Sequence, residues 1–145
     1  MEAPNPDYAQ IVSSVLLTMP IVKHYGFSLG RLAPGQAELI QPRRAELTQH
    51  DGLFAGVVLG ALGDFAAGSA AGTLLPAGWV NMTIDYTVKI MAPAGGDQVV
   101  ARGRVINAGR TTSIAAAELY SCADGEETLC ATTLVTLRNV KLPRG

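Results

Sequence analysis

The chain has 145 residues, enough for a single domain with one hydrophobic core. Apolar residues make up 48% of it and charged residues only 16%, which suggests that part of its surface is hidden in an oligomer. The net charge of −1 provides no basic field for nucleic acid or acidic lipid, so we expect neither as a partner.

The first residues and the cysteines indicate a cytoplasmic protein. The stretch from Met1 to Asp7 is acidic and proline-rich, the reverse of the basic start of a signal peptide. Residues 52–84 carry a single charge, but glycines and a proline interrupt them, so we expect no membrane span. Cys122 and Cys130 form no disulfide framework and have no metal-ligand spacing, and we expect two free thiols and no metal.

The first expected element is a helix from Asp7 to Met19, where apolar residues recur at spacings of three and four. Pro20 ends it, because proline disfavours a helical residue before it. A hairpin of two half-buried strands should follow, at residues 27–32 and 37–41, with the turn at Pro34-Gly35. We assign residues 1–25 to an N-terminal helical segment.

Residues 54–72 form an alanine- and glycine-rich run about five turns long if helical. Each glycine inside a helix costs roughly 1 kcal/mol relative to alanine, so the glycines need a reason. Close approach supplies one, because a helix without side chains on one stripe lies directly on a sheet. We therefore predict a central helix buried on all sides. Its glycines are Gly56, Gly60, Gly63, Gly68 and Gly72.

Four strands are predicted after this helix, at residues 80–90, 99–105, 114–120 and 129–137, and we expect them to form a meander. The first alternates strictly. The whole chain, residues 1–145, is then one α+β domain in which an antiparallel sheet wraps around the central helix. Trp79 and Tyr86 remain open between two roles, as core or interface aromatics or as walls of a binding pocket.

Asp64 is the only charge within the apolar run, and burying a carboxylate without partners is expensive. A structural interpretation is that it caps a loop or pairs with an arginine across a subunit boundary. The functional interpretation is a carboxylate held in a partly apolar cleft as a base or nucleophile. At helical spacing it shares a stripe with Gly56 and Gly60, so it overlooks bare backbone.

The start of the same helix suggests a second catalytic group. If the helix begins near Phe54, its first N–H groups, including that of Gly56, have no partner and carry the positive end of the helix dipole. Such donors can stabilise the oxyanion of a carbonyl under attack. Gly56 and Asp64 are eight residues apart, so in a two-fold dimer the carboxylate of one subunit can serve the oxyanion site of the other.

The stretch Gln49-His50-Asp51-Gly52-Leu53-Phe54-Ala55-Gly56, with Leu62-Gly63-Asp64, resembles the motif of the PaaI-like hotdog-fold thioesterases. That motif reads Asn-x-x-Gly-x-x-His-Gly-Gly, then six residues, then Asp or Glu. Met91-Ala92-Pro93-Ala94 and the segment ending in Gly109-Arg110-Thr111 resemble two further family turns. The resemblance runs from about Ile21 to Leu137. It implies a hotdog fold and hydrolysis of an acyl-CoA to the free acid and CoA.

Carried over residue by residue, the resemblance makes Asp64 the catalytic acid, which attacks the thioester or activates water. It makes the Gly56 N–H the group that polarises the carbonyl. Gln49 stands where the family has an asparagine, and Thr83 where some members have a serine that assists the water. The resemblance implies no cofactor, with coenzyme A only as part of the substrate. It also implies a homodimer with shared active sites, and a homotetramer built from it.

The sequence departs from the motif, since Ala55 replaces its histidine and Val57 its second glycine. The substrate-binding residues implied by the resemblance are Arg110, Ala55, Phe54 and His50. Arg110 would lie near the pantetheine or nucleotide of CoA, although an exposed edge-strand charge is an equal alternative. His50 would lie near the thioester, or else be a solvated loop residue.

Two other functions remain open. A hotdog hydratase or dehydratase acting on acyl chains would lean on a histidine paired with an acid, and neither His24 nor His50 has that context. A non-catalytic protein that binds acyl-CoA or acyl carriers would explain the altered motif around Ala55. The sequence leaves the acyl group open, from phenylacetyl to long chains, and also the choice between dimer and tetramer.

Overall fold

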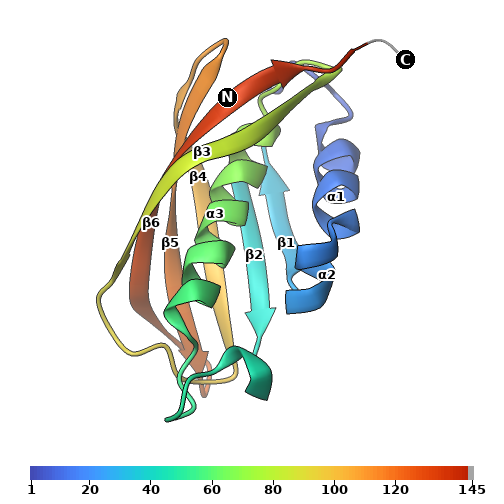
Figure 1. Ribbon diagram of the computed structural model, residues 1–145. Helices are drawn as coiled ribbons and strands as arrows, with labels where there is room; N and C mark the ends of the chain where they lie inside the picture. Colours follow the sequence, from blue (N-terminus) through green and yellow to red (C-terminus); the bar gives the residue numbers. More distant parts are fainter. Residues whose placement is uncertain (144–145) are drawn as a thin grey trace.

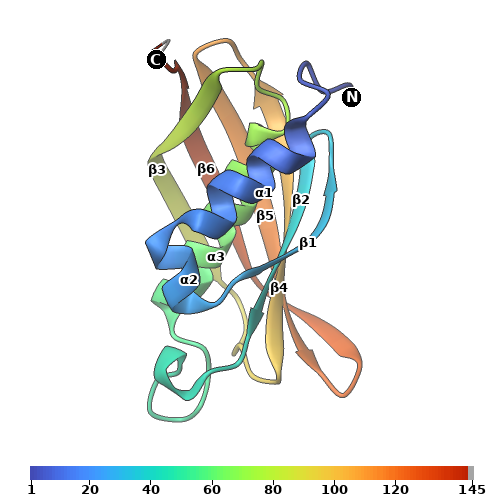
Figure 2. The same ribbon diagram turned by 90° about the vertical axis from the view of Figure 1, so that its right-hand side faces the viewer.

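Six strands form one antiparallel sheet in the order β1-β2-β4-β5-β6-β3 in the computed structural model, which describes residues 1–143. Helix α3 lies along one face of this curved sheet, and α1 packs beside α3 (Figure 1; Figure 2). This is the predicted α+β arrangement. The strands are β1 (Ser28–Ala33), β2 (Gln36–Pro42), β3 (Trp79–Ile90), β4 (Gln98–Ala108), β5 (Thr112–Ala123) and β6 (Glu126–Lys141). The helices are α1 (Tyr8–Thr18), α2 (Pro20–Tyr25) and α3 (Gly56–Gly72), with a 3₁₀ turn at Ala45–Leu47.

The N-terminal helices begin and end where proline and glycine require. Helix α1 stops before Met19, whose ψ of 129° is extended, because Pro20 disfavours a helical residue before it. Pro20 then occupies the first position of α2, where its missing N–H costs nothing. Gly26 ends α2 with a φ of 84°, a left-handed conformation that glycine adopts freely. The predicted helix and the turn after it are confirmed.

The position of β3 corrects the predicted meander. Strands β4, β5 and β6 are consecutive neighbours, but β3 pairs only with β6 and forms the far edge of the sheet. The connection from β3 to β4 is not a hairpin, because these two strands are not neighbours in the sheet. Backbone hydrogen bonds fix the connection to residues that precede α3. The carbonyl of Ala94 accepts the N–H of Phe54, and that of Asp97 accepts the N–H of Arg43. The connection therefore passes beneath the start of α3 and delivers β4 to the side of β2.

A β-bulge between Thr83 and Asp85 corrects the strict alternation predicted for β3. Side chains on a strand alternate between the two faces of the sheet. One extra residue therefore reverses which residues face α3 beyond the bulge. Thr83 on one side of the bulge and Tyr86 on the other consequently both face α3. Thr83 reaches Asp64, and Tyr86 lies against Gly60.

The glycines of α3 allow the close packing that the sequence predicts. A β-carbon added at Gly63 would lie 2.3 Å from the Thr133 side chain on β6. From the opposite layer, a β-carbon at Gly103 of β4 would lie 2.3 Å from the carbonyl oxygen of Ala66. The helix is nevertheless not buried on all sides. The sheet covers one side of it, whereas Asp64 and Phe65 on its other side are only half-buried.

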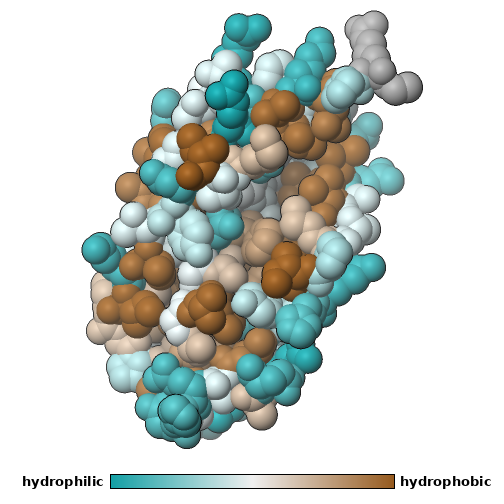
Figure 3. Space-filling view, in the orientation of Figure 1, coloured by the Kyte–Doolittle hydropathy of each residue, from teal (hydrophilic) through white to brown (hydrophobic). Residues whose placement is uncertain are grey.

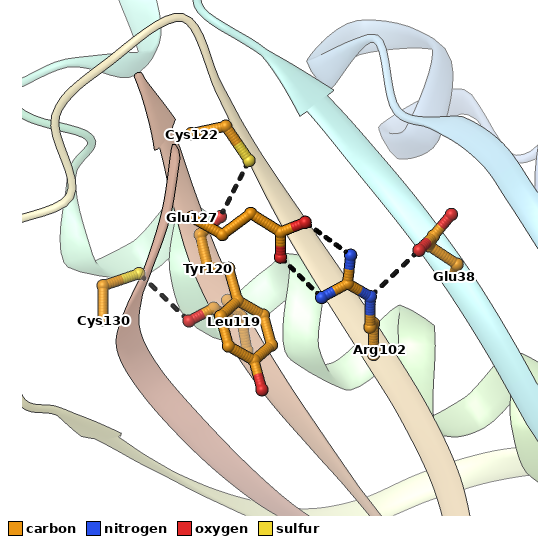
Figure 4. Close-up of polar contacts among 7 residues, drawn as sticks. All are labelled: Glu38, Arg102, Leu119, Tyr120, Cys122, Glu127 and Cys130. Atoms are coloured by element: carbon orange, nitrogen blue, oxygen red, sulfur yellow. Dashed lines mark hydrogen bonds and ion pairs between the residues drawn. The ribbon is translucent and has the colours of Figure 1, made fainter. Parts of the chain in front are cut away.

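The opposite face of the sheet carries a charged cluster (Figure 4). Arg102 on β4 forms a two-pronged ion pair with Glu127 on β6, at 2.6 and 2.8 Å, and contacts Glu38 on β2 at 3.1 Å. Its guanidinium also lies 5.0 Å from the centre of the Tyr120 ring. Hydrogen bonding to Arg102 lowers the pKa of Glu127. Cys122 lies beside this cluster, and Cys130 is buried; both are free thiols.

Candidate functional site

A cavity of about 350 Å³ lies between α1, α3 and β3. Figure 3 views the molecule from the side of α3, and apolar side chains surround a hollow there. Helix α1 contributes its predicted apolar face, α3 its half-exposed side and β3 its first residues. The lining residues that matter below are Val12, Asp64, Phe65, Gly68, Gly72, Leu75, Trp79, Asn81 and Thr83. Ligand pockets are commonly of this size and this apolar.

Asp64 and Thr83 are the polar pair of this cavity. The Thr83 hydroxyl donates a hydrogen bond of 2.6 Å to Oδ1 of Asp64. Burial raises the pKa of the Asp64 carboxyl above its ordinary value of 3.8, because desolvation disfavours the charge, and the Thr83 hydrogen bond lowers it in part. A half-buried carboxylate with a raised pKa beside an apolar cavity is a candidate for proton transfer.

The first residue of α3 is Gly56, two positions later than expected, and its N-cap is Ala55. No side chain caps this end of the helix. Within residues 1–143, neither the Gly56 N–H nor the Val57 N–H donates to an acceptor. These donors carry the positive end of the helix dipole, so they can receive a developing negative charge.

Gly56 and Asp64 lie at different places along α3. Eight residues of helix separate their α-carbons by about 12 Å along its axis. The carbon and the oxygen of a thioester carbonyl are only one bond apart. A single thioester therefore does not reach both the Asp64 carboxylate and the Gly56 N–H of the same chain. The structure therefore supplies two half-sites within each chain.

Gln49 and His50 are exposed in the loop that precedes α3, and neither lines the cavity. The Gln49 backbone is fixed, because its N–H donates to Leu53 and its carbonyl accepts from Gly52. The side chains of both residues make no hydrogen bond with the described part of the chain. They belong to the Gly56 end of the helix, so the structure does not bring them together with Asp64 in one chain.

The remaining predicted binding residues are dispersed. Phe54 is 3% exposed and packs in the core, so its side chain supports the start of α3 from within. Ala55 is half-buried at the N-cap. Arg110 is exposed in the turn between β4 and β5, where it lines a second cavity of about 240 Å³ with Asn139 and Ser113.

Sequence reasoning missed most of the cavity walls. Trp79, which it left open, lines the cavity, whereas Tyr86 is exposed on β3 beside Gly60. Asn81 was not singled out, yet its side-chain N–H donates to the carbonyl of Gly68 at 3.0 Å and ties β3 to α3. Its position two residues before Thr83, on the same face of a strand, was the available signal.

Between Met1 and Pro143, no group of three or more histidine, cysteine or acidic residues is arranged to hold a metal ion. No helix in that range has the length and apolar character that crossing a bilayer requires.

Comparisons with known proteins place the chain in a family. No family model matches it, and no curated protein does. Among solved structures, a thioesterase family protein from Silicibacter pomeroyi is 32% identical, with a TM-score of 0.90, covering 92% of this chain and 98% of that one. The chain belongs to the hotdog-fold thioesterase family.

Two more distant structures show the same fold. A thioesterase from Haemophilus influenzae is 21% identical and has a TM-score of 0.86, over 99% of this chain and 98% of that one. The PaaI protein of the phenylacetic acid degradation operon of Escherichia coli is 14% identical, with a TM-score of 0.83, over 97% and 100%. The hotdog fold that the resemblance in the sequence implies is thus confirmed.

Proposed function

We propose that this family member is an acyl-CoA thioesterase, which hydrolyses a thioester to a free acid and CoA. The observation that carries the proposal is the Asp64 carboxylate, hydrogen-bonded by Thr83 and set in the wall of an apolar cavity of about 350 Å³. An acyl group fits the apolar part of the cavity, and the carboxylate is then beside its carbonyl carbon.

In the proposed reaction Asp64 acts as general base or as nucleophile. As a base it takes a proton from water, and the hydroxide oxygen bonds to the carbonyl carbon. The tetrahedral intermediate then expels the CoA thiolate, which takes up the proton. Thr83 holds Oδ1, so Oδ2 is the oxygen free to act on water or on the thioester. Helix N–H groups from Gly56 receive the negative charge on the carbonyl oxygen.

The two half-sites require a second copy of the chain. Strand β3 is a sheet edge with β6 on one side only, and it exposes large apolar residues. These are Met82, Ile84, Tyr86 and Ile90. A long apolar edge is a template for pairing. We propose a two-fold dimer through β3, in which Gly56, Ala55, Gln49 and His50 of one subunit face Asp64 of the other, and a tetramer built from two dimers.

The function is tested by measuring thiol release from a panel of alkyl- and aryl-CoA esters at neutral pH. We expect turnover of at least one member, with free acid and CoA in equal amounts. Tight binding of the esters without thiol release would instead identify a binding protein. Addition of water across an enoyl-CoA without thiol release would identify a hydratase.

Thr83→Val is expected to move the pH dependence of hydrolysis. The Thr83 hydrogen bond lowers the pKa of Asp64, so removing it raises that pKa further. Asp64 acts as the carboxylate, and the acidic limb of kcat/KM should therefore shift to higher pH. The measurement is a pH profile of both proteins on one acyl-CoA.

The matched control is Thr128→Val on β6, where the threonine is exposed and away from the cavity. Its profile should coincide with that of the wild type. An unchanged acidic limb in Thr83→Val, or a shift to lower pH, would contradict the role assigned to the Asp64–Thr83 pair.

A further inference from the structure

The cavity extends well beyond the Asp64–Thr83 pair. Its lining follows α3 from Asp64 through Gly68 to Gly72, about 12 Å along the helix axis. Asp64 is the only charged residue among its lining residues, and it lies at one end. Leu75 and Trp79 lie toward the other end. Beyond the reacting groups the lining is therefore uncharged and mostly apolar, with Ser69 and Asn81 as its polar members.

Glycine keeps the α3 wall of this cavity open. A β-carbon added at Gly68 would lie 3.5 Å from Leu137 and 3.9 Å from Asn81, which are ordinary contacts. The backbone there is in an ordinary helical conformation, so packing does not demand a glycine. Asn81 holds the facing strand in place by donating to the Gly68 carbonyl. Because Gly68 has no side chain, the space beside it in the cavity is open to a ligand.

Trp79 lies where this cavity adjoins the second one. It lines both the cavity of about 350 Å³ and the neighbouring one of about 240 Å³, and Leu75 does the same. The two cavities are thus adjacent and share Trp79 and Leu75 as lining residues. The depth available from Asp64 is set at this end by Trp79.

We propose that the cavity is the chamber for an extended apolar acyl chain, which the missing side chain at Gly68 admits and whose length Trp79 limits. This inference rests on the proposed function and names its substrate class. An extended chain advances about 1.2 Å per single bond, so a chamber of about 12 Å holds a chain of roughly ten carbons. A chain ending in a charge has no partner at the apolar end and is rejected.

Two substitutions test the chamber in opposite directions, with butanoyl-, octanoyl-, decanoyl- and hexadecanoyl-CoA as probes. Gly68→Leu places a side chain in the chamber, pointing toward Asp64 as helical side chains do. It should lower the ratio of kcat/KM for decanoyl-CoA to that for butanoyl-CoA by about tenfold or more, because several methylenes lose their burial. Trp79→Ala joins the two cavities and should raise the ratio for hexadecanoyl-CoA over decanoyl-CoA.

Gly68→Ala adds one methyl group and serves if Gly68→Leu does not fold; it should change the decanoyl ratio in the same direction. Equilibrium binding of the same esters to Asp64→Asn protein separates the two proposals. If binding strengthens with chain length but the wild type hydrolyses none of the esters, the proposed thioesterase function is contradicted and the acyl-chain chamber is supported. Hydrolysis whose chain-length ratios stay unchanged in Gly68→Leu or Gly68→Ala and in Trp79→Ala would overturn the chamber.

Discussion

Asp64→Asn is expected to lower kcat for thioester hydrolysis by about 10²–10⁴-fold, the range that a positioned base contributes. Asparagine keeps the shape of the side chain, and its carbonyl oxygen still accepts the Thr83 hydroxyl that now donates to Oδ1. It has no basic oxygen with which to take a proton from water or attack the thioester. The measurement is thiol release under saturating acyl-CoA.

The same substitution should stabilise the protein at neutral pH. Burial raises the pKa of Asp64 in the folded chain above its ordinary value of 3.8. The folded state thus binds this proton more tightly than the unfolded state. This tighter proton binding stabilises the folded chain fully at pH values below the pKa of Asp64 in the unfolded chain. The stabilisation is lost as pH rises through the pKa of Asp64 in the folded chain. Once Asp64 is ionised, the wild type carries a desolvated charge that the asparagine variant avoids.

We therefore expect a higher Tm for Asp64→Asn than for the wild type at pH 7, and a difference that shrinks as pH falls through the raised pKa of Asp64 and is smallest below about pH 4. Glu126→Gln is the matched control, because Glu126 is an exposed carboxylate at the start of β6, away from the cavity and from β3. It should change neither the activity nor the Tm appreciably. A lower Tm together with lost activity in Asp64→Asn would show that the carboxylate holds the fold, and the catalytic assignment would fail.

Local sequence signals were enough to predict most of the elements. The apolar spacing of residues 7–19 and the proline after them define α1, because both act within a few residues. Asp124-Gly125 is a dipeptide typical of hairpin turns, and it forms the β5–β6 turn with φ values of 52° and 79°. The glycines of α3 indicated close packing, and the contacts of Gly63 confirm it.

The placement of β3 depends on long-range contacts that no local pattern contains. Its partner is β6, some fifty residues later, and the bulge beside Thr83 changes which side chains face α3. Bulges often re-aim a side chain next to a functional site. Without this one, Thr83 and Tyr86 would point to opposite faces. The cavity likewise needs α1 and β3 together, so neither its volume nor the place of Trp79 follows from the sequence.

Gly56→Pro should lower kcat by about 10²–10³-fold, the loss typical of removing one oxyanion donor. Proline lacks the N–H but suits the first position of a helix. Ala55 before it has φ −66° and ψ 145°, an extended conformation that a following proline favours. A β-carbon added at this position meets only the end of the Ile90 side chain, at 3.1 Å. The fold should therefore survive.

Gly56→Ala is the control for this change, because it adds the same β-carbon beside Ile90 and keeps the N–H. It should retain far more activity than Gly56→Pro. Equal losses in the two variants would assign the effect to the side chain and remove the backbone donor from the mechanism.

Co-expression of Gly56→Pro with Asp64→Asn tests whether the two half-sites come from different subunits. Each variant alone is inactive in both sites of its dimer. A mixed dimer has one site with both lesions and one site with neither. With equal expression half of the dimers are mixed, so activity should recover to about a quarter of that of the wild type. A site contained within one chain would give no recovery, because every chain then carries a lesion.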